Sequence, residues 1–359
     1  MKQQTLWQNL HKPILALSPM DGVTDAAFRY MFAKYGKPSI FFTEFTNVEG
    51  LSRGVVKLLD DFIYSPLEHP IIAQIFGTTP EDYYKVTFMA CEMGFDGIDI
   101  NMGCPDNDVT KRGGGAALIL NPPLAKKIIR SVQQGIKDWT EGKTIESVDV
   151  HTDILHFIHA FKQKNHTTNN RKVLPVSVKT RIGYSDVVIT EWVKHLLETE
   201  VDNISIHGRT LKQMYTGSAN WDEIGKAAEI IKQTKTTILG NGDIKNLDEA
   251  HLKVKQYNLD GVLIGRATFG NPYFFNLDKK EMTIQERLDL CLEHSEYYVK
   301  ELPNKPFIAL RKHLAWYMKS FEGAVEMRTK LVQVNSLDEV RRIVEEYRNK
   351  ETKTPPLAG

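Results

Sequence analysis

The chain has 359 residues, 42% hydrophobic and 25% charged, with a formal net charge of +1. This composition is that of an ordinary globular protein, long enough for a barrel-sized domain and an appendage, and it excludes a globally basic polyanion binder. The three scattered cysteines, Cys91, Cys104 and Cys291, indicate a reducing compartment and form neither a disulfide framework nor a paired metal site. We expect a cytoplasmic protein, because no apolar run is long enough to cross a membrane. The sequence gives no sign of its oligomeric state, so a monomer is the default.

Short apolar runs alternate with amphipathic stretches through most of the chain. Such runs are typical of buried parallel strands, and proline in a first turn, as at Pro80 and Pro122, favours a helix start. The expected strands span residues 14–20, 39–45, 70–77, 97–103, 173–182, 203–208, 236–242 and 261–265. The expected helices span residues 25–35, 80–93, 122–136, 190–200, 221–232 and 247–255.

Eight strands alternating with helices predict an α/β fold, a (β/α)8 TIM barrel, which needs roughly 250 residues. A doubly wound open sheet is the alternative, but eight regular repeats favour closure. Between the second and third strands, residues 55–61 form a modest helix at best. The segment 138–172 interrupts the rhythm with an amphipathic run, and we interpret it as an insertion.

After residue 276 the pattern changes to helices only, at 283–300, 307–321 and 337–347. Basic side chains, among them Arg311 and Lys312, outnumber their acidic neighbours there. A solvated helical face is the ordinary explanation, and a surface for nucleic-acid phosphates is the functional one. The predicted domains are a barrel over 1–276 with an insertion at about 138–172, a helical domain over 277–350, and a tail over 351–359.

The most specific motif is Asn-Met-Gly-Cys-Pro at residues 101–105, which is followed by three glycines at 113–115. Proline fixes φ and lacks a donor, so the chain must leave the strand after Pro105. Cys104 therefore lies just past the carboxyl end of a strand, where barrels keep their chemistry. A lone cysteine is often only a small buried hydrophobe, so this thiol gains meaning from its neighbours.

Several other strand ends carry polar groups that packing does not require. A glutamine inside an apolar strand needs a partner, and a buried strand lysine is rare unless paired. Glycines at the ends of the seventh and eighth strands let backbone amides approach an anion, and barrels commonly bind phosphate there. The residues concerned are Ser18, Pro19, Met20, Gln74, Lys179, Arg181, His207, Asn241, Gly242, Asp243, Gly265 and Arg266.

These strand ends predict a phosphate-bearing cofactor at the mouth of the barrel. Lys179 would place positive charge beside it, which suits an anionic reduced flavin. Pyridoxal phosphate is the rival cofactor, since it also requires a lysine and a phosphate cup. The thiol, Gln74 and the lack of an evident pyridinium partner favour flavin.

Taken together, the motifs resemble those of the tRNA-dihydrouridine synthase family, nearly from end to end. The similar stretches are residues 18–25, 43–44, 73–74, 101–105, 179–183, 207–209, 241–244 and 265–267, with 311–317 and 336–340 in the helical part.

The resemblance implies a flavin mononucleotide (FMN) enzyme that reduces selected uridines of tRNA to 5,6-dihydrouridine with NADPH. It implies Cys104 as the general acid that protonates carbon 5 of the uracil, while reduced flavin delivers hydride to carbon 6. Asn101 matches a position that orients the target base. The resemblance places the flavin against Ser18, Pro19, Met20, Gln74, Lys179, His207, Asn241, Gly242, Asp243, Gly265 and Arg266. The tRNA would be held by Lys111, Arg112, Arg181, Arg311 and Lys312.

The chain departs from the family at residues 106–108, Asp-Asn-Asp, where many relatives carry lysines. Two carboxylates disfavour phosphate approach, although Asp106 and Asp108 could pair with Lys111, Arg112 or Arg181. Two other functions stay open: a flavin barrel acting on a small pyrimidine or enone, and a catalytically weak, flavin-carrying RNA-binding protein. The basic helical part argues against the first, and the retained motif residues argue against the second. The sequence leaves open which uridine is reduced and whether NADPH or NADH is used.

Overall fold

A single parallel sheet forms the centre of the barrel unit in the computed structural model, which describes residues 5–167, 170–214, 216–279 and 281–351. The hydrogen-bonded order is β1-β9-β8-β7-β6-β5-β4-β2, with β3 paired to β4. All eight predicted strands are present, and β3 is an additional short one. The strands are β1 (Ile14–Leu17), β2 (Phe41–Phe42), β3 (Thr46–Asn47), β4 (Ile71–Phe76), β5 (Gly97–Met102), β6 (Val176–Arg181), β7 (Asn203–His207), β8 (Thr237–Asn241) and β9 (Gly261–Ile264).

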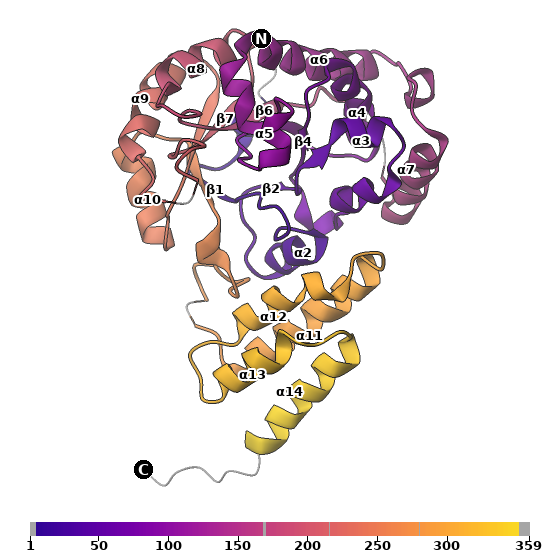
Figure 1. The fold of residues 1–359 in the computed structure, drawn as a ribbon, viewed down its shortest axis with the longest axis vertical. Helices are drawn as coiled ribbons and strands as arrows, with labels where there is room; N and C mark the ends of the chain where they lie inside the picture. Colours follow the sequence, from indigo (N-terminus) through magenta and orange to yellow (C-terminus); the bar gives the residue numbers. More distant parts are fainter. Residues whose placement is uncertain (1–4, 168–169, 215, 280, 352–359) are drawn as a thin grey trace. The chain divides into compact units, whose positions relative to one another are not determined.

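The first and second strands close the sheet on itself. The Ser39 amide donates to the Leu15 carbonyl at 2.8 Å, and the Leu15 amide donates to Ser39 Oγ at 3.0 Å. Helices surround the strands on the outside, as Figure 1 shows for α4, α6, α8, α9 and α10. The predicted (β/α)8 barrel is therefore confirmed, and the open-sheet alternative is wrong.

The helices of the chain's first three quarters begin where local chemistry favours them. The prolines predicted to start helices lie in the first turns of α4 and α6, and Asn121 caps α6 by accepting from the Leu124 amide at 3.2 Å. The short helix α3 and the 3-10 helix Val56–Phe62 fill the irregular interval between the second and third strands. The α-helices are α1 (Leu6–Asn9), α2 (Ala26–Tyr35), α3 (Val48–Ser52), α4 (Pro80–Glu92), α5 (Asn107–Lys111), α6 (Pro122–Thr140), α7 (Thr152–Asn165), α8 (Ile189–Leu197), α9 (Trp221–Ile231) and α10 (Leu247–Gln256).

Apolar side chains fill the end of the barrel where the strands begin. Trp7 of α1 is fully buried and packs with its ring centroid 6.1 Å from that of Phe42. Burying such a cluster removes its apolar surface from water, which stabilises this end of the fold. The other members of the cluster are Ile14, Ala16, Ile40, Ile72, Leu239 and Leu263.

The predicted insertion at 138–172 contains helix α7, which packs on the barrel through its apolar stripe. Ile154, Ile158 and Phe161 are buried, and the Phe161 ring lies 5.2 Å from that of Tyr64. Glu92 of α4 holds the segment against the barrel. Its carboxylate accepts from Trp139 Nε1 at 2.8 Å and forms an ion pair with Lys162.

The chain divides into two compact units, one of residues up to Asp21 and Pro38–Ala267, the other of Gly22–Lys37 and everything from Thr268 onward. The expected division placed the boundary after residue 276 and put helix 25–35 in the barrel. Helix α2 instead groups with the later helices, because Tyr30 stacks on Tyr297 at 3.8 Å and Lys34 pairs with Glu293 at 2.7 Å.

The second unit contains, besides α2, helices α11 (Ile284–Glu301), α12 (Arg311–Tyr317), α13 (Ala324–Leu331) and α14 (Leu337–Glu351). The helix predicted over 307–321 is a 3-10 helix, Phe307–Ala309, followed by α12, and it ends at Tyr317, before the predicted end. Met318 leaves the helical region with a ψ of 82° and so ends α12, and Gly323, with a φ of 80°, sets the start of α13. None of the described helices is long and apolar enough to span a membrane. The predicted tail lies outside the described residues, except for Glu351.

Candidate active site

The interior of the barrel is polar towards the carboxyl ends of β4 to β7. Thr180 points outward, since its Oγ1 accepts from Trp192 Nε1 of α8 at 3.0 Å. Side chains alternate along a strand, so Lys179 and Arg181 face the interior. The residues predicted from strand ends of the barrel unit gather at this one end, because parallel strands terminate together.

The loop that carries Cys104 is held by the side chain before it. Asn101 Oδ1 accepts from the amides of Gly103 at 3.0 Å and Cys104 at 2.8 Å. Behind the loop, Gly115 has a φ of 56°, and a Cβ there would lie 2.8 Å from the Cys104 carbonyl oxygen. The glycine-rich stretch after the motif therefore lets a second segment pack directly against the backbone of Cys104.

The Cys104 thiol is nearly enclosed, with 8% of the residue exposed. Burial raises its pKa, and the carboxylates of Asp21 and Asp106 add to the rise, against an opposing backbone hydrogen bond and Arg181. A raised pKa keeps the thiol protonated at neutral pH, which suits a proton donor rather than a nucleophile.

Lys179 and Arg181 bring positive charge to the same end of the barrel. Burial, with help from the neighbouring Arg181 cation, lowers the pKa of Lys179 to about 8. Arg181 was predicted to bind substrate, but its guanidinium donates to the backbone carbonyls of Gly103 at 2.6 Å and Thr210 at 3.3 Å. In this structure Arg181 therefore holds the backbone of the Cys104 loop in place through its hydrogen bonds.

Two arginines and a carboxylate join the ends of β7, β8 and β9. Asp243 Oδ2 accepts from Arg209 at 2.6 Å, and Oδ1 accepts from Arg266 at 2.8 Å. Burial opposes ionisation of Asp243, yet hydrogen bonds from Arg209 and the Ala219 amide, with the charges of Arg209 and Arg266, outweigh it and lower its pKa. Burial holds the pKa of His207 well below its usual range, and the Lys179 and Arg181 cations lower it further, so its imidazole is neutral.

Close backbone approach explains the glycines at these two strand ends. Gly242 has a φ of 138°, and a Cβ there would lie 2.5 Å from the Ala219 side chain. A Cβ on Gly265 would lie 3.1 Å from Met20 Sδ. Asn241 donates to the Leu263 carbonyl at 2.9 Å and so joins β8 to β9. Bare backbone beside Arg266, whose side chain is 62% exposed, makes this place suited to an anionic group.

The predicted cations Lys111 and Arg112 lie at the end of α5, directly after the Cys104 loop. Both are exposed, and Arg112 lines a cavity of about 250 Å³ together with Asn47, Phe76 and Thr78. Asp106, one of the unusual acids, caps this helix by accepting from the amides of Asp108 at 2.9 Å and Val109 at 3.2 Å.

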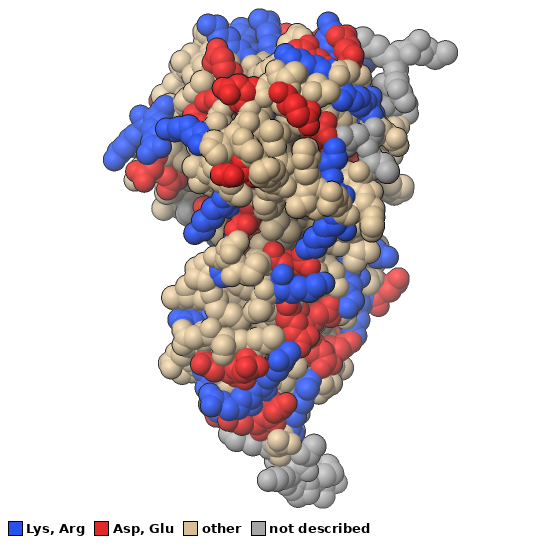
Figure 2. Space-filling model, turned by 90° about the vertical axis from the view of Figure 1, so that its right-hand side faces the viewer, with Lys and Arg blue, Asp and Glu red and all other residues tan. Residues whose placement is uncertain are grey.

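Arg311 and Lys312 lie at the start of α12 in the second unit. Arg311 donates to the carbonyl of Val334 at 2.6 Å, to that of Gln333 at 3.1 Å and to Asn335 Oδ1 at 2.6 Å. Its guanidinium thus clamps the turn before α14, whereas Lys312 is half-buried and has no such role in the described contacts. On the face shown in Figure 2, basic and acidic side chains are interspersed, as the net charge of +1 suggests.

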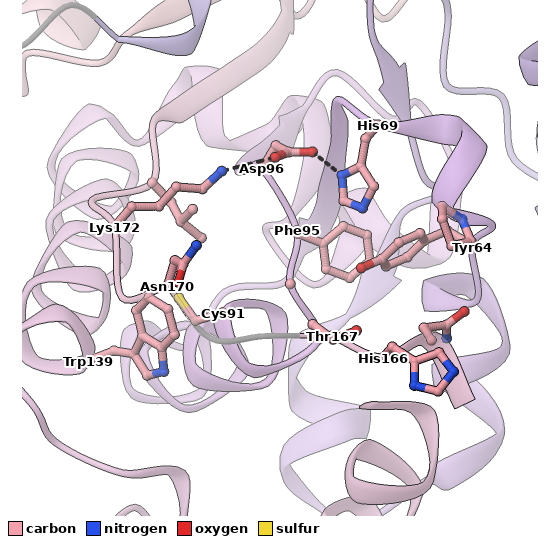
Figure 3. A pocket seen from close by; sticks show the side chains of 14 residues that line it. Tyr64, His69, Cys91, Phe95, Asp96, Trp139, His166, Thr167, Asn170 and Lys172 are labelled. Carbon is pink, nitrogen blue, oxygen red and sulfur yellow. Dashed lines mark hydrogen bonds and ion pairs between the residues drawn. The ribbon is translucent and has the colours of Figure 1, made fainter. Parts of the chain in front are cut away.

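A separate cavity of about 300 Å³ lies where β4 and β5 begin, at the end of the barrel opposite the strand ends described above. Figure 3 shows Asp96 between His69 and Lys172, with the rings of Tyr64 and Phe95 beside them. The Asp96 carboxylate contacts His69 Nδ1 at 2.5 Å and Lys172 Nζ at 3.1 Å. Cys104 and the glycines predicted at strand ends lie at the carboxyl ends of the strands and not in this cavity, whose lining includes Cys91 instead.

Comparisons with known proteins agree with the motifs. The family model described as dihydrouridine synthase (Dus) matches residues 15–164 and 153–353. A probable tRNA-dihydrouridine synthase of Staphylococcus aureus (strain Mu50) is 34% identical, covering 96% of each chain. A probable tRNA-dihydrouridine synthase 2 of Bacillus subtilis (strain 168) is also 34% identical, covering 97% of this chain and 98% of the relative. A structure of DHODH from Eimeria tenella in complex with ferulenol covers 71% of this chain and 76% of its own, with a TM-score of 0.44 and 12% identity, a likeness too slight to bear on function.

Both the length of these matches and their identity place the chain in a single family. The family model matches nearly the whole chain, and the alignments with the two relatives cover almost all of it. This chain belongs to the dihydrouridine synthase family.

Proposed function

We propose that this protein is a tRNA-dihydrouridine synthase that reduces selected uridines to 5,6-dihydrouridine with FMN and NADPH. The observation that carries the proposal is the protonated, enclosed thiol of Cys104 at the carboxyl end of a barrel strand. The proposal is supported by relatives named as probable tRNA-dihydrouridine synthases over nearly the full chain. It makes the protein an oxidoreductase that acts on RNA.

The strand ends fit a phosphate-bearing flavin. Arg266, which follows β9 and is exposed, can meet a phosphate there, and Lys179 supplies positive charge on the interior face of β6. Reduced FMN, when bound, supplies the hydride that goes to carbon 6 of the uracil. Ser18, Pro19, Met20, Gln74, His207, Asn241 and Asp243 complete the proposed flavin site.

The chain's own residues supply the proton. Cys104 donates the proton of its thiol to carbon 5 of the uracil, so hydride and proton together reduce the carbon–carbon double bond. The thiolate that remains regains a proton from solvent, and the neighbouring Arg181 cation stabilises it meanwhile. The Cys104 loop keeps the thiol in place because Asn101 and Arg181 bind its backbone.

The target uridine must leave its stack to reach this site, as for other enzymes that act on a base within RNA. We propose that Asn101 orients the base and that Lys111 and Arg112, beside the Cys104 loop, bind its flanking phosphates. Asp106 leaves that surface less repulsive than its sequence position suggests, because its oxygen is engaged in capping α5.

The proposal is tested with Cys104→Ala. The variant should release FMN on denaturation and oxidise NADPH with oxygen as the original protein does, yet form little dihydrouridine on unmodified tRNA. The loss expected is about 100-fold or more, typical of a missing general acid. Undiminished product would remove Cys104 as the acid, and protein that cannot be loaded with FMN would refute the cofactor.

A further inference from the structure

Asp99 is a charged side chain in the middle of β5 that is completely buried. Its Oδ2 accepts from Gln74 Nε2 of β4 at 2.7 Å, and its Oδ1 accepts from Ser177 Oγ of β6 at 2.6 Å. Burial raises its pKa to about 6, against these hydrogen bonds and the Lys179 cation, so it is ionised at neutral pH. An ionised carboxylate only accepts hydrogen bonds, and this fixes which end of the Gln74 amide faces it.

The orientation of Gln74 in turn fixes the next amide. With Nε2 committed to Asp99, Gln74 presents Oε1 to Asn101, whose Nδ2 donates to it at 3.1 Å. Asn101 then has Oδ1 left for the amides of Gly103 and Cys104, at 3.0 and 2.8 Å. Asp99, Gln74, Asn101 and Cys104 are all buried, so water cannot substitute for a lost partner without cost.

We propose that Asp99 is a positioning residue, which sets the placement of the Cys104 thiol through the amides of Gln74 and Asn101. Each hydrogen bond in this series has one direction only, and the carboxylate at its start decides all of them. Asp99 acts through other residues and has no role as an acid or base. The part of this inference that concerns uridine reduction rests on the proposed function, whereas the placement of the thiol does not.

A different role for Asp99 would be electrostatic, since its charge lies near Lys179. Two substitutions separate these roles. Asp99→Asn removes the charge but keeps a carbonyl oxygen to accept from Gln74, while its new amide can donate to Ser177. Asp99→Leu removes both the charge and the acceptor at similar size. We call the series of hydrogen bonds from Asp99 through Gln74 and Asn101 to Cys104 the relay. If Asp99 acts through the relay, the reactivity of Cys104 should differ between the two variants. If it acts through its charge, Cys104 should react equally in both.

The experiment measures alkylation of the FMN-loaded protein by iodoacetamide, followed at the Cys104 peptide by mass spectrometry, without tRNA. Asp99→Leu should react about fivefold faster, the factor expected when loss of about one hydrogen bond frees the loop. Asp99→Asn and the control Ser205→Ala, a buried serine bonded to Asn203 outside the relay, should stay within about twofold of the original protein. Dihydrouridine formation by Asp99→Leu should fall about tenfold in kcat with KM for tRNA unchanged, because the acid is misplaced while binding is not.

Unchanged alkylation of Asp99→Leu, or equal rates for Asp99→Leu and Asp99→Asn, would overturn the relay. If Asp99→Leu does not fold, Gln74→Glu is compared with the exchanged pair Gln74→Glu/Asp99→Asn at equal FMN content, because Gln74 also belongs to the proposed flavin site. The single change sets two carboxylates against each other, and the exchanged pair restores one donor facing one acceptor, so its Cys104 reactivity should return towards the original. Equal reactivity of single and exchanged variants would contradict the relay. Failure of the original protein to reduce uridine would refute the proposed function alone, because alkylation does not depend on it.

Discussion

At the scale of single residues, the site depends on groups that hold the backbone of Cys104. Asn101 binds its amide, Arg181 binds the preceding carbonyl, and Gly115 lets a second segment lie against it. The thiol is thus placed from several sides, as its proposed role as proton donor to one carbon atom requires.

Gly115→Ala should damage catalysis through this contact. The added methyl group would lie 2.8 Å from the Cys104 carbonyl oxygen and would require a φ of 56°, so the loop must shift. We expect dihydrouridine formation to fall about tenfold or more with FMN content unchanged. Gly113→Ala is the matched control, since it also has a positive φ but meets no atom closer than 3.9 Å. Equal effects of the two changes would mean that backbone strain, and not contact with Cys104, is responsible.

The pH dependence of the reaction follows from Lys179, and protonation of Asp99 should affect it little. Below about 6 Asp99 gains a proton. A protonated carboxyl still has a carbonyl oxygen to accept from Gln74 and a hydroxyl to donate to Ser177, which are the two kinds of group that Asp99→Asn keeps. Above about 8 Lys179 loses its charge, so dihydrouridine formation should fall there. Rates measured across pH under saturating NADPH check this. An acid-side fall that is present in the original protein and absent in Asp99→Asn would contradict it.

At the scale of elements, short apolar runs predicted every barrel strand except the two-residue β3, and most helices. The side-chain interactions that decide which helices pack together were harder to predict from the sequence. Helix α2 looked like an ordinary barrel helix, but tyrosine stacking and an ion pair join it to α11, and both depend on residues far away in sequence. Helix α13 was missed because its hydrophobic pattern is weak and its start is set by the conformation of Gly323.

The candidate site was also only partly predictable. The motif around Cys104 and the glycines of β8 and β9 stood out, since each lies at a strand end. Asp99 was overlooked, although an aspartate within an apolar strand is itself a signal that a buried partner exists. The engagement of Arg181 and Arg311 with backbone carbonyls could not be read from sequence, because positive charge alone does not distinguish a brace from an RNA contact.

Arg311 and Lys312 should behave differently for this reason. Arg311→Ala removes hydrogen bonds to the turn before α14 and should lower the free energy of unfolding by about 1 kcal/mol, seen as a lower melting temperature. Lys312→Ala should leave the melting temperature unchanged. If Lys312 meets a tRNA phosphate, its loss should also reduce the salt slope of tRNA binding by about one. Equal melting shifts for both variants would contradict the clamp assigned to Arg311.

At the scale of the whole molecule, the barrel unit is apolar where its strands begin and polar where β4 to β7 end. Burial of one end stabilises the fold, and the other end is free to carry chemistry. The charges on the surface are mixed rather than concentrated, so RNA binding would rest on local groups such as Arg112 and not on the net charge of +1.

The most direct measurement is nucleoside mass spectrometry of unmodified tRNA after incubation with the FMN-loaded protein and NADPH. We predict a gain of two mass units on uridine, at a defined position of the tRNA and dependent on Cys104. No such product from protein that carries flavin and oxidises NADPH would contradict the proposed function. Activity on free uracil or an enone in its place would point to a small substrate.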